Sequence, residues 1–193
     1  MTPLPVRLFV SWVLGRMELS ARELEHASQS AHRLQEVALM VHLFAGYPRG
    51  LAALAQAVQL GRLPPMPETV QLASGDRERG MGLFRQVYGE VADRVADQIR
   101  DLHPDALHWV LTHAYGRVLN RPGLSLAERE VLAVAALTAL GSLPQLKGHV
   151  VGAIRCGASG AALRDAVDQI TDLAEPEHVR TARAFIDGAA EAD

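Results

Sequence analysis

Cysteine is nearly absent from this chain, which has one, Cys156, among 193 residues. A single cysteine excludes an internal disulfide, a metal cage of several thiolates and a vicinal dithiol redox motif. The chain therefore fits a reducing compartment, and we expect a cytoplasmic location. No metal site is expected, because His103, His108 and His113 recur every five residues, a spacing that spreads side chains around an α-helix.

Excess positive charge and long apolar runs are also missing. The formal net charge is −3 and the pI is near 6.2, so the chain lacks a basic excess for binding a nucleic-acid backbone. The apolar stretch LFVSWVLG, residues 8–15, is about half as long as a membrane-spanning helix, and acidic residues soon follow. We expect a buried helix there, with a signal peptide as the alternative, and neither nucleic acid nor a membrane as a partner.

Alternating runs rich in Val, Ile and Thr, which are typical of strands, do not occur. Apolar residues instead recur at three- and four-residue spacing, which predicts an all-α fold of about ten helices separated by Gly and Pro clusters. The least periodic segment, residues 61–79, is expected to be a surface linker between a helical half-unit at 1–60 and a core unit at 80–193. All three parts should form one compact fold.

Two segments are apolar nearly all round, VALMVHLFA at 37–45 and VLAVAALTAL at 131–140. Such helices must be surrounded by protein, and each follows a glutamate, Glu36 or Glu130. The chain also repeats a pattern of helix, glycine turn and helix when Gly15 is laid on Gly141. A duplicated unit should pack its two central helices against each other.

Glu130 and His149 are candidates for a site within this repeat. Ser125 and Glu128 match the S-x-x-E capping box, which gives Glu128 a structural task and leaves Glu130 in need of a partner if it points inward. In a hairpin that turns near Gly141, His149 comes level with Glu130 to within a few ångströms. The alternative is a water-exposed glutamate and a histidine bonded to a backbone carbonyl.

The stretch from Phe84 to Asp168 resembles the carboxymuconolactone decarboxylase family, above all AYGRVLNRPGLSLAEREVLAVAALTALGSLPQLKGHVVGAIRCGAS. HLFAGYPRGLAAL, at 42–54, resembles the segment that closes that family's single domain, so the segment order looks permuted or partly duplicated. The resemblance implies a helical bundle of the alkyl hydroperoxide reductase D type. It also implies a homo-oligomer, a trimer or hexamer, or a dimer if the repeat replaces a subunit contact.

The resemblance implies one of two chemistries. The family's peroxidases have a glutamate, a Cys-x-x-Cys pair and a histidine, which map here to Glu130, Ser142, Gln145 and His149. Both cysteines of that pair are missing, so dithiol peroxide reduction is excluded. Cys156, just before Gly157 at a predicted helix end, is expected to be a buried packing residue.

The decarboxylase branch needs no cofactor, and it implies a lyase acting on a small lactone or carboxylic acid. His149 would return the proton with Glu130 orienting it, and Arg129 would hold a carboxylate. Tyr115 and His42 are further candidates for the pocket wall, although core packing is the expected role of Tyr115, Trp109 and His42. Two alternatives stay open: a non-catalytic oligomeric helical module, and a hydroperoxide-handling relative that uses external thiols through Cys156.

Overall fold

The all-α fold class is confirmed by the computed structural model, which describes residues 3–64 and 75–191 and has no strand among them. The elements follow in the order α1 (Val6–Leu14), α2 (Met17–His26), α3 (Ala31–Gln59), α4 (Asp76–Tyr88), η1 (Gly89–Val91), α5 (Ala92–Leu102), α6 (Pro104–Trp109), η2 (Val110–Val118), α7 (Leu126–Leu140), α8 (Leu143–Arg155), α9 (Gly160–Asp168) and α10 (Pro176–Ala190). Most of the expected linker lies outside the described residues, and α4 already begins at Asp76, inside the range expected for it.

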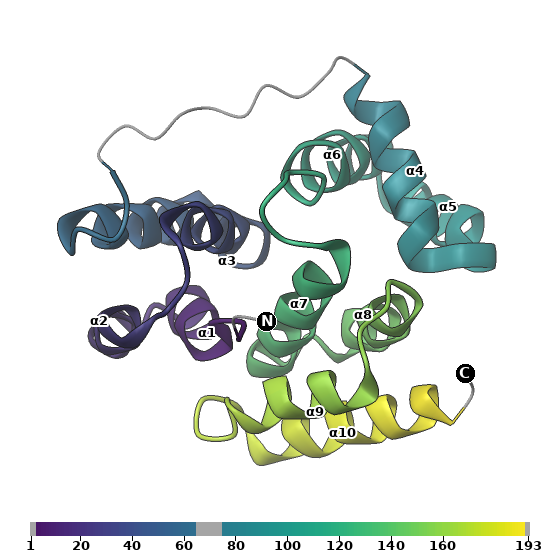
Figure 1. Cartoon of the computed structure of the whole chain (residues 1–193). Coiled ribbons are helices and arrows are strands. Elements are labelled where there is room, and N and C mark those ends of the chain that lie inside the picture. The colour runs from purple at the N-terminus through teal and green to yellow at the C-terminus, as the bar shows by residue number, and fades with distance from the viewer. Residues whose placement is uncertain (1–2, 65–74, 192–193) are drawn as a thin grey trace.

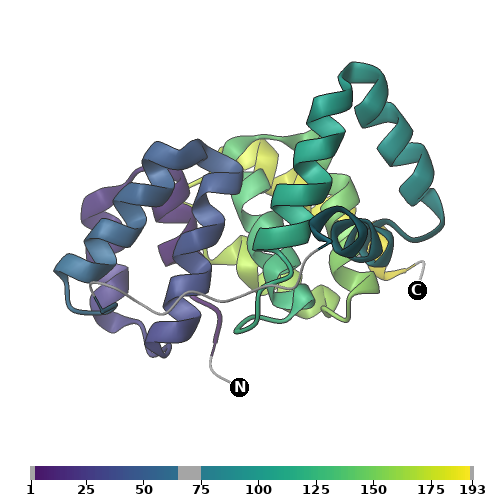
Figure 2. The same cartoon turned by 90° about the horizontal axis from the view of Figure 1, so that it is seen from above.

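Helix α7 is the central element of the molecule. It contacts α1, α8, α9 and α10, and every residue from Arg129 to Thr138 is buried. Figures 1 and 2 both show α1 to α3 on one side of α7 and α4 to α6 on the other. The prediction that the 131–140 segment is surrounded by protein is therefore confirmed as far as Thr138.

The predicted direct packing of the two apolar helices against each other is wrong. Residues 37, 38, 40 and 41 of α3 are buried, but α3 and α7 make few contacts, and each packs extensively on α1 instead. Helix α1 contains the stretch LFVSWVL and is almost wholly buried, as expected. It covers apolar faces of both α3 and α7. The periodic pattern marks a buried face but does not say which helix covers it.

Helix α3 is two helices joined at a sharp break. Gly46 has φ 75° and ψ 170°, values outside the helical region, and Pro48 follows at the start of the second part. By length and composition alone, α3 is the one helix among the described residues that is long and apolar enough to cross a membrane. The break divides it into parts that are each shorter than the roughly 20 residues a spanning helix needs.

The repeat is visible in the turns that end α1 and α7. Gly15 and Gly141 both have φ 69°, with ψ 29° and 21°, and the residue after each glycine bonds back to a carbonyl near the helix end. These are equivalent left-handed helix caps, and the next helix begins two residues after each. The alignment of Gly15 with Gly141 thus reflects a shared local structure.

Segment η2 is a π-helix of nine residues, Val110–Val118. Its hydrogen bonds join residues five apart, so side chains at that spacing come near one face. Glycines allow α4 to lie against it: a Cβ on Gly80 would sit 1.8 Å from the Leu111 carbonyl oxygen. The backbone of η2 is therefore in direct contact with α4.

Candidate functional site

The hairpin of α7 and α8 brings Glu130 and His149 together. A complete capping box of Ser125 and Glu128 begins α7, and the left-handed Gly141 turns the chain into α8. His149 Nδ1 lies 2.8 Å from Glu130 Oε2. Glu130 is 1% exposed and the His149 side chain 17% exposed, so the imidazole lies between the buried carboxylate and the solvent.

Three aromatic residues of α4 and η2 pack against one another, and the charge of Glu130 acts on the two tyrosines among them. The rings of Phe84 and Tyr115 are 5.1 Å apart, and those of Phe84 and Tyr88 are 4.4 Å apart. Gly152 of α8 lies close to both α4 and the pair, since a Cβ there would be 2.6 Å from Val87 Cγ1 and 3.5 Å from Glu130 Oε2. A larger residue at that position would push α8 away from α4.

Burial and the Glu130 charge set the protonation of this cluster. Burial alone would lower the pKa of His149, but the charge of Glu130 and its hydrogen bond outweigh burial and raise that pKa above its usual value. Burial, with the nearby Tyr88 and Glu130, raises the pKa of Tyr115 well above the ordinary range. The Tyr115 hydroxyl is buried and interacts with Tyr88, whose pKa is raised by burial and lowered by a hydrogen bond from Tyr115.

Cys156 is partly exposed, contrary to the expectation of full burial. It follows α8, and Gly157 has the left-handed φ of 98° expected of a helix end. Burial, and then the charge of Glu130, raise the pKa of the Cys156 thiol to about 11. A thiol with that pKa is almost entirely protonated at neutral pH, which disfavours nucleophilic attack on a peroxide.

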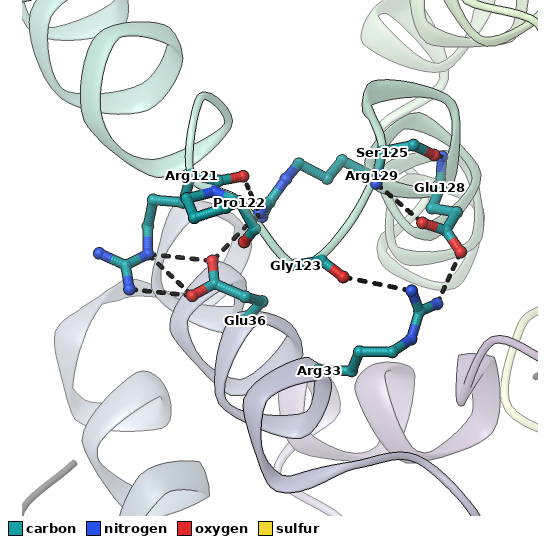
Figure 3. A network of polar contacts seen from close by, with 8 residues as sticks. All are labelled: Arg33, Glu36, Arg121, Pro122, Gly123, Ser125, Glu128 and Arg129. Carbon is teal, nitrogen blue, oxygen red and sulfur yellow. Dashed lines mark hydrogen bonds and ion pairs between the residues drawn. The ribbon is translucent and has the colours of Figure 1, made fainter. Parts of the chain in front are cut away.

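Arg129 points away from the Glu130 and His149 pair. It is wholly buried, and its Nη2 donates to Glu36 Oε2 at 3.0 Å and to the Arg121 carbonyl at 2.7 Å (Figure 3). Its Nε and Nη1 have no hydrogen-bond partner in the described chain, but the whole side chain is buried, so the guanidinium is closed to a substrate carboxylate that approaches from solvent. The structure places Arg129 in an interhelix network instead of beside His149.

That network joins α3 to α7 and to the loop before α7 (Figure 3). Arg121 contacts both oxygens of the buried Glu36, and Arg33 donates to Glu128 Oε1 at 2.6 Å and to the Gly123 carbonyl at 3.2 Å. The sequence marks Glu36 as an acidic residue beside an apolar run, but it does not say which arginine neutralises it. Spacing along the chain did not predict this network.

His42 also lies apart from the pair. Its Nε2 is 2.7 Å from Nε2 of His113, its Nδ1 is 2.5 Å from the Leu39 carbonyl, and the ring of Tyr47 stacks on it at 5.2 Å. The structure thus brings Glu130 and His149 into contact, and the charge of Glu130 acts on the pKa of Tyr115, whereas Arg129 and His42 have other partners. Trp109, expected in the core, is 64% exposed.

Two hollows are described on the surface, and neither includes Glu130 or His149. One, of about 750 Å³, lies among the first residues of the chain, the start of α7 and α9; the other, of about 370 Å³, is lined by Asp76, His108, Thr112, His113 and Arg117. Within residues 3–64 and 75–191, no group of three or more His, Cys, Asp or Glu is arranged to hold a metal ion.

The chain is thus an all-α protein in which a carboxylate and an imidazole face each other across the hairpin of α7 and α8. The model of the carboxymuconolactone decarboxylase family matches residues 104–187, from α6 into α10, and the chain belongs to that family. The match includes Tyr115, Glu130 and His149. It also extends beyond Asp168, the residue at which the resemblance was expected to end.

Three relatives show what the chain is similar to. Peroxisomal protein 2 of Schizosaccharomyces pombe is 30% identical over 147 residues, 73% of this chain and 68% of the relative. The protein of the same name from Saccharomyces cerevisiae is 23% identical over 175 residues, 76% of this chain but only 60% of the relative. 4-carboxymuconolactone decarboxylase of Acinetobacter baylyi is 26% identical over 91 residues, 47% of this chain and 68% of the relative.

Proposed function

We propose that this protein is a cofactor-free lyase that removes carbon dioxide from a small lactone acid or related carboxylic acid and returns a proton to the product. The hydrogen bond of 2.8 Å between His149 Nδ1 and Glu130 Oε2 carries the proposal. The similarity of part of the chain to a 4-carboxymuconolactone decarboxylase supports it. Fold alone does not fix an activity, so the proposal rests on the pair.

The pair is suited to a single proton return. Glu130 accepts from Nδ1–H, which leaves the Nε2 edge of His149 for the substrate. When the carbon–carbon bond to the carboxylate breaks, carbon dioxide leaves and the electron pair stays on the substrate, delocalised into the lactone. The imidazolium donates its Nε2 proton to that carbanion and becomes neutral, and solvent restores the proton at the partly exposed ring.

Tyr115 is the proposed donor to the developing anion. Its hydroxyl is buried beside Tyr88, from which a substrate would have to draw its hydrogen bond, and its raised pKa keeps the proton on the oxygen at neutral pH. A buried donor is most effective where negative charge develops in the transition state. Arg129 and His42 have other partners, so the proposed site consists of Glu130, His149 and Tyr115.

The test measures the decarboxylation of 4-carboxymuconolactone and of a panel of small lactone acids, with the release of carbon dioxide as the signal. We expect turnover by the wild type and a loss of about 100-fold or more in His149→Gln, because a positioned acid contributes on that order. His26→Gln, at an exposed histidine of α2, is the matched control and should keep full activity. Undiminished turnover in His149→Gln would remove the pair from the mechanism.

A non-catalytic helical module is the second candidate. It is favoured by the near-complete burial of Glu130 and by the absence of the pair from both described hollows. Inactivity of the wild type on the whole panel, with unaltered folding, would support the module. The alternative based on external thiols is weakened by the thiol pKa of about 11 at Cys156.

We also propose a homo-oligomer, for which the exposed Tyr47, Leu51 and Trp109 offer apolar surface. The expected trimer, hexamer or dimer would differ in mass by light scattering.

The names of two relatives contain the word peroxisomal, so a peroxisomal location competes with the cytoplasmic one. Neither location would require a membrane or nucleic acid as a partner.

A further inference from the structure

The second hollow, which has no part in the proposed lyase site, is polar and lies at the π-helix. Its lining comes from three elements: Asp76 of α4, His108 of α6, and Thr112, His113 and Arg117 of η2. In an α-helix His108 and His113 would point in different directions. The π-helical segment, with bonds between residues five apart, brings them to one hollow, and π-helices are frequent at functional sites.

The hydrogen bonds of His42 fix where the protons of the histidine pair lie. The Leu39 carbonyl can only accept, so His42 Nδ1 carries a proton and donates it. A neutral His42 then accepts at Nε2, and Nε2–H of His113 is the donor across 2.7 Å. A neutral His113 consequently has an unprotonated Nδ1, the one nitrogen of the pair that is left to take up a proton.

Two guanidiniums meet at the carboxylate of Asp76, beside the hollow. The guanidiniums of Arg79 and Arg117 share a single carboxylate, Asp76, each with a contact of 2.5 Å. Arg117 uses only its Nε there; its two terminal amino groups make no hydrogen bond to the described chain, and its side chain is 66% exposed. These amino groups form an open fork of the kind that binds a planar oxyanion.

We propose that the hollow lined by His108, His113 and Arg117 binds a small oxyanion, a carboxylate or phosphate group, and that binding is coupled to the uptake of one proton by His113. The Arg117 fork would hold two oxygens of the ligand, and the proton would add to Nδ1 of His113. This protonation keeps the Nε2–H bond to His42, so the contact between α3 and η2 survives.

The groups that face His113 explain why an anion and a proton bind together. Burial lowers the pKa of His113, and the neighbouring His42 and Arg117 lower it further, so the free protein keeps this imidazole neutral. The other groups around it are Tyr47 of α3, Asp76 of α4 and His108 of α6. A bound anion offsets Arg117 and stabilises the imidazolium, and linkage then requires that protonation strengthen anion binding.

The test is isothermal titration calorimetry with inorganic phosphate and, separately, succinate, at low salt and near pH 7, in two buffers of different ionisation enthalpy. We expect saturable binding of at least one anion and a heat that changes with the buffer, which reports proton uptake. The tighter of the two distinguishes a phosphate site from a carboxylate site. Absence of saturable heat with both anions, or heats independent of the buffer, would overturn the proposal.

Two variants separate the parts of the proposal. Arg117→Gln should weaken binding about ten-fold or more, because it removes a charge-assisted contact. His113→Gln keeps an N–H donor for His42 but takes up no proton, so weaker binding without buffer dependence is expected. Arg100→Gln, on the exposed face of α5 outside the hollow, is the control. Equal binding by Arg117→Gln and wild type, with circular dichroism unchanged, would place the anion elsewhere. Glu130 and His149 do not line this hollow, so the result is independent of the lyase test.

Discussion

At the level of single residues, the contact between His149 and Glu130 makes stability depend on pH. The pKa of His149 is raised in the folded protein by Glu130. A histidine with a raised folded-state pKa contributes stability that is fully present below the unfolded-state pKa of about 6.5 and is lost as pH rises through the folded-state value. The sign is opposite to that of a salt-bridged aspartate.

We therefore expect His149→Gln to reduce the free energy of unfolding most at about pH 6, and progressively less as the pH rises above the folded-state pKa of His149. Urea unfolding of both proteins, followed by circular dichroism across this range, measures the difference. His26→Gln controls for the loss of a histidine elsewhere. A destabilisation that grows with rising pH would contradict the proposed direction of the shift.

The sequence was sufficient to predict the contact between Glu130 and His149, but it did not predict where the side chain of Arg129 points. Distance from the Gly141 turn placed His149 level with Glu130, and the two residues are in contact. Arg129 is adjacent to Glu130 in the chain, but one residue of an α-helix turns the side chain by about 100°. Glu130 therefore faces α8, whereas Arg129 faces α3, and only the packing of distant segments decides what lies there.

At the level of elements, the π-helix is the feature that the sequence analysis missed. Expectations for His108, His113 and Trp109 assumed α-helical geometry, and the actual segment changes hydrogen bonding at Val110. Two histidines five apart then line one hollow, and Trp109 points to solvent. The residues of η2 carry no propensity that distinguishes a π-helix; its close packing on α4 is a tertiary effect.

The contact between α4 and η2 gives a prediction with an internal control. A Cβ at Gly80 would lie 1.8 Å from the Leu111 carbonyl oxygen, whereas one at Gly82, on the same helix, meets nothing within 4 Å. Gly80→Ala should lower the free energy of unfolding by about 3 kcal/mol, the upper part of the range for overpacking. Gly82→Ala should be neutral or stabilising by up to about 1 kcal/mol, since alanine is the better helix former. Thermal unfolding of the two variants compares them, and equal melting temperatures would show that η2 moves aside without cost.

At the level of the whole molecule, periodicity was enough for the fold class and for the burial of α1 and α7. It was not enough for the partners of each helix, because an apolar face fits any other apolar face of suitable shape. The first three helices lie outside the range matched by the family model, yet α1 packs on α7 and supplies part of its covering. The residues that specify how this group docks are the polar ones, Glu36 and its arginines.

Replacing Glu36 should therefore lower the free energy of unfolding by more than the loss of one carboxylate would suggest. It is wholly buried, and it forms ion pairs with Arg121 and with the wholly buried Arg129 across the junction of α3 with α7. In Glu36→Ala, two guanidiniums remain near the interior without their partner. Removing one member of a buried ion pair costs about 3–5 kcal/mol, well above the loss expected for a surface glutamate.

Urea unfolding of Glu36→Ala measures this cost, with Glu25→Ala on the exposed face of α2 as the matched control. Glu25→Ala should change the free energy of unfolding by less than about 0.5 kcal/mol. The double variant Glu36→Ala with Arg129→Met should recover part of the loss, because it removes the uncompensated charge together with its partner. If Glu36→Ala were as stable as Glu25→Ala, the network would not hold the first helices to α7, and the docking of these helices would depend on the apolar contacts of α1 alone.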